Sequence, residues 1–129
     1  MKTLLVVDDE FDLTNTIRAV LESSGYRVET AHDGRQAIEQ LQQTKPDLVL
    51  MDVMMPVMDG LGVLRKIRNA PSMENLPVIL MCVLAPSVSR EEFRWQMFLR
   101  KPFTLENLLK AVEQQIGKGE PARAEKVLR

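Results

Sequence analysis

Three short apolar runs constrain the fold of this chain most, because each is too short for a typical helix and is apolar at every position. They are residues 4–7, 48–51 and 78–84. A strand that is apolar on both faces belongs to a parallel sheet covered by helices on both sides, whereas a half-exposed strand alternates apolar and polar residues. Two further strands are predicted at residues 26–30, which alternate in this way, and at residues 97–99.

Helical patterns separate these runs. The first predicted helix has its apolar side at Leu13, Ile17, Val20 and Leu21 and ends near Gly25. Three later helices are expected to follow the capping residues Asp33, Asp59 and Thr104, and the last has its apolar face at Leu105, Leu108, Leu109, Val112 and Ile116. Strands that alternate with helices predict an open α/β sandwich, a doubly wound parallel (βα)5 sheet.

The segment between the last two strands is the weakest part of this pattern. Ser89 with Glu92 resembles a capping box, but little of the sequence before residues 97–99 is clearly helical. The helix expected there is therefore predicted to be short or remodelled.

The composition bounds the organisation and the partners of the chain. Its 129 residues suit one domain, predicted at residues 1–117, followed by a tail or linker at residues 118–129. With 17 basic and 18 acidic side chains, the net charge of −1 gives no electrostatic reason to expect nucleic acid or an anionic membrane as a partner.

The single cysteine, Cys82, suits a reducing compartment. Because the sequence has no apolar run of membrane-spanning length and no room for a signal peptide, a cytoplasmic location is expected.

Acidic residues stand at the ends of two buried strands. Asp8 and Asp9 follow the first run, and Asp52 ends the run at residues 48–51. In parallel sheets the functional crevice lies at the carboxyl ends of the strands, where neighbouring backbones are about 4.8 Å apart. Three carboxylates that close repel one another unless a cation joins them. Oxygen ligands without Cys or His favour Mg²⁺, with Mn²⁺ as an alternative, over zinc.

A lysine is expected at the same edge of the sheet. Lys101 follows the strand at residues 97–99 and would bring a positive charge to Asp52. A metal ion and a lysine beside one carboxylate suit the charge that develops on a phosphoryl group during transfer. Asp52 would then be the nucleophile and would form an acyl phosphate. The alternative reading of Asp8 and Asp9 is a strand-end turn and helix cap without a site.

Four motifs of this chain, taken together, resemble the receiver domain of a two-component response regulator. They are residues 6–10, the loop 52–60, residues 77–79 and residues 101–103. The resemblance covers residues 3 to about 117 and implies a flavodoxin-like strand order, 2-1-3-4-5. It also implies that Asp52 accepts a phosphoryl group from the phosphohistidine of a sensor histidine kinase or phosphotransfer protein. Such a chain is a phosphoacceptor in phosphorelay signal transduction and not an enzyme, although it assists its own phosphorylation and dephosphorylation.

The resemblance also implies roles for particular residues. Mg²⁺ would be held directly by Asp9, Asp52 and the carbonyl of Met54, and through water by Asp8. Lys101 would contact the phosphoryl group, and the bond between Lys101 and Pro102 would be cis, which an X-Pro bond adopts at low cost.

The sequence departs from the receiver pattern at the positions that transmit the signal. Cys82 stands where receivers have Thr or Ser, and a thiol is a weaker hydrogen-bond donor than a hydroxyl. The aromatic switch position is Phe98, and the pair Arg94-Trp95 replaces two small residues. In this family the fourth helix, fifth strand and fifth helix form the usual surface for a downstream protein partner or a homodimer. Trp95, Arg94 and Arg100 are the candidate residues of that surface, and the switch is expected to be weakened.

Two other functions remain alternatives. The first is a degenerate receiver that binds its partner independently of phosphorylation, for which the departures at Cys82 and Trp95 are the reason. The second is a Mg²⁺-dependent phosphatase acting through Asp52, which the lack of a visible second domain or cap disfavours. The sequence leaves open the kinase, the output, the oligomeric state and whether the chain is a stand-alone receiver or part of a longer regulator.

Overall fold

A five-stranded parallel sheet forms the centre of the molecule in a computed structural model, which describes residues 1–55, 57–84 and 94–120. The strands lie in the order β2-β1-β3-β4-β5, so the predicted order 2-1-3-4-5 and the flavodoxin-like fold are confirmed. Every neighbouring pair is parallel. The strands are β1 (Thr3–Val7), β2 (Arg27–Ala31), β3 (Leu48–Asp52), β4 (Val78–Cys82) and β5 (Met97–Arg100).

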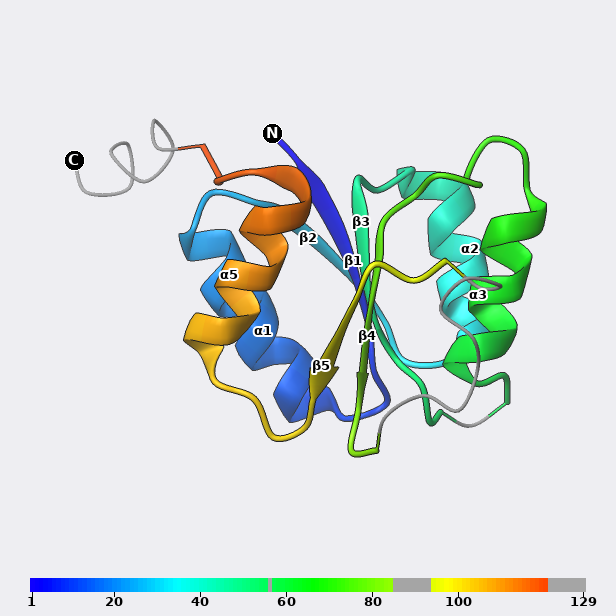
Figure 1. Cartoon of the computed structure of the whole chain (residues 1–129), viewed down its shortest axis with the longest axis horizontal. Helices are drawn as coiled ribbons and strands as arrows, with labels where there is room; N and C mark the ends of the chain where they lie inside the picture. The colour runs from blue at the N-terminus through cyan, green and yellow to red at the C-terminus, as the bar shows by residue number, and fades with distance from the viewer. Residues whose placement is uncertain (56, 85–93, 121–129) are drawn as a thin grey trace.

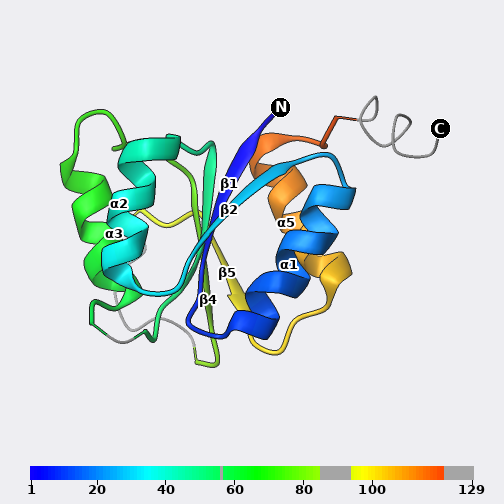
Figure 2. The same cartoon turned by 180° about the vertical axis from the view of Figure 1, so that it is seen from behind.

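Helices cover both faces of this sheet, as Figures 1 and 2 show. On one face lie α1 (Phe11–Ser23) and α5 (Leu105–Ile116), and on the other lie α2 (Gly34–Thr44) and α3 (Gly60–Asn69). The predicted short or remodelled helix, with Ser89 and Glu92, falls at residues 85–93 and so lies outside the described residues.

The predicted helix caps form. Asp33 accepts a hydrogen bond from the backbone N–H of Gln36, and Asp59 accepts one from Gly62. Thr104 accepts one from Asn107, so α5 begins where the sequence predicts. One prediction for α5 is wrong. Leu105 is 40% exposed and does not belong to the buried face, which begins one turn later at Leu108.

Residues 4–7 of β1 and 48–51 of β3 are apolar at every position because their side chains enter two different clusters. Leu4, Val6, Leu48 and Leu50 pack on the side of α1 and α5, whereas Leu5, Val7, Val49 and Met51 pack on the side of α2 and α3. All eight side chains are fully buried. This two-sided burial fixes the register of β1 against β3, and that register positions the residues that follow the two strands.

The last described residues return to the amino end of the sheet. The backbone N–H of Glu120 donates to the carbonyl of Gly25 at 3.2 Å, and the Glu120 carboxylate pairs with the Met1 ammonium at 2.7 Å. Gly25 has a φ of +93°, and a Cβ there would lie 2.5 Å from the Glu120 nitrogen. Only glycine permits both this backbone conformation and this close approach.

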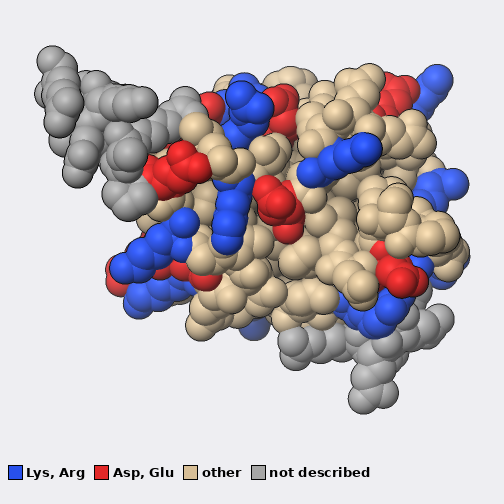
Figure 3. Space-filling view, turned by 90° about the horizontal axis from the view of Figure 1, so that it is seen from above, with Lys and Arg blue, Asp and Glu red and all other residues tan. Residues whose placement is uncertain are grey.

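The surface at the amino ends of the strands carries charges of both signs. Figure 3 shows Lys and Arg side chains interspersed with Asp and Glu over this face. Among the described residues, no helix combines the length and the apolar character that crossing a membrane requires.

Candidate functional site

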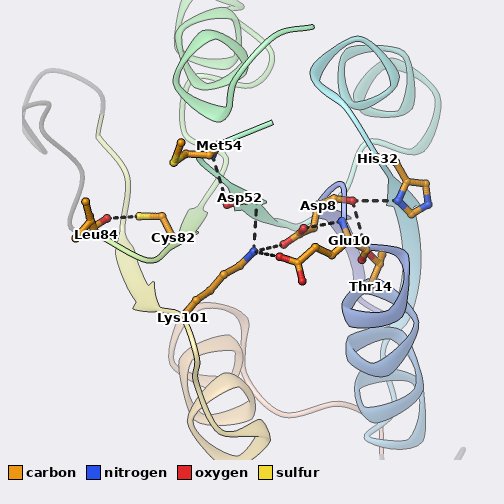
Figure 4. A network of polar contacts seen from close by, with 9 residues as sticks. All are labelled: Asp8, Glu10, Thr14, His32, Asp52, Met54, Cys82, Leu84 and Lys101. Carbon is orange, nitrogen blue, oxygen red and sulfur yellow. Dashed lines mark hydrogen bonds and ion pairs between the residues drawn. The ribbon is translucent and has the colours of Figure 1, made fainter. Parts of the chain in front are cut away.

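The register of the sheet brings the predicted acidic residues together. Val7 of β1 lies opposite Met51 of β3, so the next residues along these strands, Asp8 and Asp52, are neighbours. Carboxylate oxygens of Asp8, Asp9 and Asp52 all lie within 4.8 Å of one another. The prediction that these three side chains crowd into one place is therefore confirmed at the carboxyl ends of β1 and β3. Figure 4 shows two of them, Asp8 and Asp52, side by side.

Asp8 is the most deeply buried of the three. Its side chain is fully buried, and its two carboxylate oxygens have different partners. Oδ1 accepts a hydrogen bond from the backbone N–H of Glu10 at 2.9 Å, and Oδ2 accepts one from Lys101 Nζ at 2.7 Å. These contacts compensate the cost of burying its charge.

Lys101 is positioned by the sheet. Its backbone N–H donates to the carbonyl of Cys82 at 2.8 Å, which extends the pairing of β4 with β5. Its ammonium lies 3.5 Å from Asp52 Oδ2 and 3.5 Å from Glu10 Oε1 (Figure 4). Burial alone would lower the pKa of Lys101, but the hydrogen bond and the charge of Asp8, together with the charge of Asp52, raise it above its usual value. Lys101 is therefore a fixed cation at the edge of the carboxylate cluster. The Lys101-Pro102 bond is cis, as predicted.

Asp52 has a different electrostatic setting from Asp8. Its pKa is raised from 3.8 to about 6, first by burial and then by the negative charge of Asp8. The Lys101 charge and the hydrogen bond that the Met54 N–H donates to Oδ1 at 3.4 Å act in the opposite direction and only partly offset this. The ionised Asp52 carboxylate is thus under-compensated by the protein, which is the condition that a bound cation relieves.

The surroundings of the cluster fit a hard cation. Asp9 is exposed and lines a hollow of about 420 Å³ together with Val53, Met54, Met55 and Asp59. Three carboxylates within ligand reach beside an open hollow offer oxygen ligands and leave room for water, which Mg²⁺ retains when it binds proteins. The acidic triad therefore offers the kind of ligands that Mg²⁺ prefers.

Cys82 lies near the site but does not point a reactive thiolate into it. It is 4% exposed, and Sγ donates to the carbonyl of Leu84 at 2.6 Å (Figure 4). Burial first, and then the negative charge of Asp52, raise the pKa of the thiol, with Lys101 acting in the opposite direction. The thiol hydrogen thus points to the backbone that follows β4 and not to the acidic cluster.

The other predicted switch and partner residues lie along β5 and the segment before it. Phe98 is half-buried and lies opposite Leu80 in the sheet. Trp95 is half-buried and packs against the apolar cluster on the side of α2 and α3, while Arg94 and Arg100 are exposed. The structure does not join these four residues to the acidic cluster, and their role in switching or partner binding stays a prediction.

Two contacts of the site were not predicted. Glu10 faces Lys101, and the run Asp8-Asp9-Glu10 contained the signal for it. His32 is not among the predicted site residues, yet its ring contacts the carbonyl of Asp8 at 3.0 Å. No local pattern could have indicated this contact, because it depends on β1 and β2 being neighbours.

Comparison with known proteins identifies the family. Residues 4–113 match the family described as Response regulator receiver domain. The response regulator MprA of Mycobacterium ulcerans is 38% identical over 109 residues, which are 82% of this chain and 46% of that protein. MprA of Mycobacterium tuberculosis strain H37Rv is 34% identical over 124 residues, 94% of this chain and 53% of that protein. The chain thus spans about half the length of these curated relatives.

Solved structures agree with the fold and the site. The Vibrio cholerae chemotaxis protein CheY4 superposes with a TM-score of 0.84 at 29% identity, over 90% of this chain and 99% of that one. The receiver domain of the sensor histidine kinase PA1611 from Pseudomonas aeruginosa superposes with a TM-score of 0.80 at 31% identity, over 89% and 97% of the two chains. That structure has a magnesium ion coordinated in its active site cleft.

Receiver domains are phosphoacceptors that partner with histidine kinases, and they are not enzymes that turn over outside substrates. The fold, the carboxylates Asp8, Asp9 and Asp52, and the adjacent Lys101 agree with this assignment. The chain belongs to the response regulator receiver domain family, and its acidic site is that of a phosphoacceptor.

Proposed function

We propose that Asp52 is the residue that accepts the phosphoryl group, from the phosphohistidine of a sensor histidine kinase or phosphotransfer protein in the cytoplasm. The observation that carries this proposal is that the Asp52 carboxylate lies beside both a fixed cation and two other carboxylates. Lys101 Nζ lies 3.5 Å from Asp52 Oδ2, and carboxylate oxygens of Asp8 and Asp9 lie within 4.8 Å. Asp8 is fully buried and already paired with Lys101, which leaves Asp52 as the better nucleophile.

In the proposed reaction, a carboxylate oxygen of Asp52 forms a bond to phosphorus as the bond from phosphorus to the histidine nitrogen breaks. The electron pair of the broken bond stays with the imidazole, and the product on this chain is a phosphoaspartate. Lys101 holds its positive charge on one side of Asp52, where it can pair with a phosphoryl oxygen. Glu10 and Asp8 keep the ammonium in this place.

Asp9, Asp52 and the carbonyl of Met54 are the proposed direct ligands of Mg²⁺, with Asp8 acting through water; Mn²⁺ suits the same oxygen ligands. The hollow beside Asp9 and Met54 supports this choice. A bound divalent cation neutralises charge on the phosphoryl oxygens during transfer. The magnesium ion in the cleft of the PA1611 receiver domain is further support.

Treatment with a small acyl or amido phosphate tests the assignment of Asp52. The wild-type chain is expected to gain one phosphoryl group in the presence of Mg²⁺ and none in its absence, as measured by intact-protein mass spectrometry. Asp52→Asn is expected to gain none, because the amide cannot form the acyl phosphate. Asp59→Asn is the matched control, since Asp59 lines the same hollow but caps α3. Phosphoryl incorporation by Asp52→Asn at the wild-type rate would contradict the proposal.

We propose that the signal leaves through the surface formed by the fourth helix, β5 and α5, which would bind a downstream protein or a second copy of the chain. β5 is an edge strand of the sheet; Arg100, its last residue, and Arg94, which precedes it, are exposed. Trp95 lies two residues before this strand and is the third candidate contact residue. We further propose that residues 1–117 form the receiver domain and that residues 118–129 are a tail or linker; residues 121–129 lie outside the described part of the chain.

The coupling of the site to this surface is expected to be weak because of Cys82. Beryllofluoride, which mimics the phosphoryl group, is expected to change the fluorescence of Trp95 less in the wild type than in Cys82→Thr, since the hydroxyl is the stronger donor. Cys82→Ala, which has no donor, is the control and should respond least. Equal fluorescence responses in the wild type, Cys82→Thr and Cys82→Ala would show that residue 82 does not determine how strongly the site is coupled to this surface. No response in any of them, with metal bound, would favour the alternative of a receiver that binds its partner independently of phosphorylation.

A further inference from the structure

His32 touches the loop between β1 and α1 at both of its ends. It follows directly after Ala31, the last residue of β2. Its Nδ1 lies 3.0 Å from the carbonyl oxygen of Asp8, at the start of the loop (Figure 4). Its ring stacks on the ring of Phe11, the first residue of α1, with centroids 3.8 Å apart and an interplanar angle of 23°. The residues between these two contacts are Asp9 and Glu10.

The first contact fixes the peptide that precedes Asp9. A carbonyl oxygen can only accept, so Nδ1 of His32 carries a hydrogen and donates a hydrogen bond to the backbone carbonyl of Asp8. The N–H of Asp8 donates to the carbonyl of Ala31 at 3.1 Å, so both polar groups of the Asp8 backbone are bound to the end of β2. The Thr14 hydroxyl is a weaker second donor to Asp8, at 3.5 Å, because it bonds the Glu10 carbonyl at 2.7 Å.

The second contact holds the beginning of α1. Glu10 is the N-cap residue of this helix, and among the described residues its side chain makes no capping hydrogen bond. Phe11 is 61% exposed, so burial in the core does not hold its ring in place. Its stacking on His32 joins the first turn of α1 to the end of β2.

We propose that His32 is a positioning residue for the metal site: by holding both ends of a two-residue segment, it fixes the Asp9 carboxylate toward Asp52. The inference rests on the proposed function, because it assigns a task to His32 only if Asp9 binds the metal. Groups that orient the ligands of a metal ion commonly affect its affinity although they do not touch it.

Direct metal titration tests this inference without any phosphorylation assay. Binding of Mn²⁺ is followed by electron paramagnetic resonance of the free ion, and binding of Mg²⁺ by calorimetry. His32→Ala is expected to weaken both affinities by about tenfold. His32→Asn is expected to recover most of this loss, because the asparagine side-chain amide can present an N–H at the position of Nδ1. His32→Gln extends one bond further and should not recover it. Phe11→Leu removes the stacking alone and should fall between wild type and His32→Ala.

Leu109→Ala is the control for general destabilisation, since Leu109 packs against the core on the α5 side away from the site and its loss should leave the metal affinity unchanged. Equal affinities of the wild type and His32→Ala would overturn the inference and leave the proposed function intact. An equal loss in His32→Ala and His32→Asn would also overturn it, because the hydrogen bond would then not matter. If the wild type itself binds neither ion, the proposed metal site fails and the inference fails with it.

Discussion

Replacing Lys101 with methionine is expected to lower the free energy of unfolding of the metal-free protein by about 3 kcal/mol near neutral pH. The reason is the burial of its principal partner. Asp8 is fully buried, and Lys101 Nζ is 2.7 Å from its Oδ2. Methionine fills a similar volume but leaves the Asp8 carboxylate charged and uncompensated in the interior, with Asp52 close by. Equilibrium unfolding in urea measures the change.

A double-mutant cycle separates this charge effect from lost packing. In the Lys101→Met/Asp8→Asn double variant the buried Asp8 charge is removed together with its partner, so much of the lost stability is expected to return. Lys110→Met is the matched control, because Lys110 is exposed and pairs with Glu106 on the surface of α5. A loss below about 1 kcal/mol in Lys101→Met, the range of exposed pairs, would mean that the ion pair with Asp8 contributes little.

The sequence predicts that Lys101 lies near the carboxylates but not which carboxylate it pairs with. How far a contact can be predicted depends on whether its partners are close in the sequence. Caps such as Asp33 and Thr104 depend on residues three positions away, and their prediction is confirmed. The meeting of Asp8, Asp52 and Lys101 is not local, but it follows from the rule that parallel strands end at one edge of the sheet. Once the order of the strands is predicted, the residues at their ends are placed to within a few ångströms.

Contacts that depend on side-chain direction could not be predicted in this way. Nothing in the sequence distinguishes Oδ2 of Asp8 as the closest partner of Lys101, or brings His32 to the Asp8 carbonyl. The error at Leu105 has a related cause. The residue continues the apolar spacing of α5, but it occupies the first position of the helix, and the buried face begins only at Leu108. Periodicity indicates which side of a helix is buried and not where along the helix the burial starts.

The same carboxylate cluster predicts a stabilising substitution. Asp52→Asn is expected to raise the free energy of unfolding of the metal-free protein by about 2 kcal/mol above pH 6. The pKa of Asp52 is about 6 in the folded chain and 3.8 ordinarily, so folding favours the protonated carboxyl. The stabilisation that the protonated Asp52 carboxyl gives the folded state is complete below the unfolded pKa of 3.8 and is lost as the pH rises through 6. Above that pH the folded protein carries the cost of an ionised Asp52 beside Asp8, which the neutral amide avoids.

Urea unfolding across this pH range, in the presence of a chelator, is the measurement. The difference between Asp52→Asn and the wild type should shrink as the pH falls through 6 and vanish below about 4, where both side chains are neutral. Asp12→Asn on the exposed surface of α1 is the control and should show no such step. Near neutral pH, saturating Mg²⁺ should reduce or reverse the difference in unfolding free energy between Asp52→Asn and the wild type. The reason is that metal binding stabilises the wild type by mass action, whereas the variant has lost one ligand. If the metal-free wild type is as stable as Asp52→Asn at every pH, the ionised Asp52 carboxylate is not destabilised by burial and by Asp8. The electrostatic argument for a cation at this site would then fail.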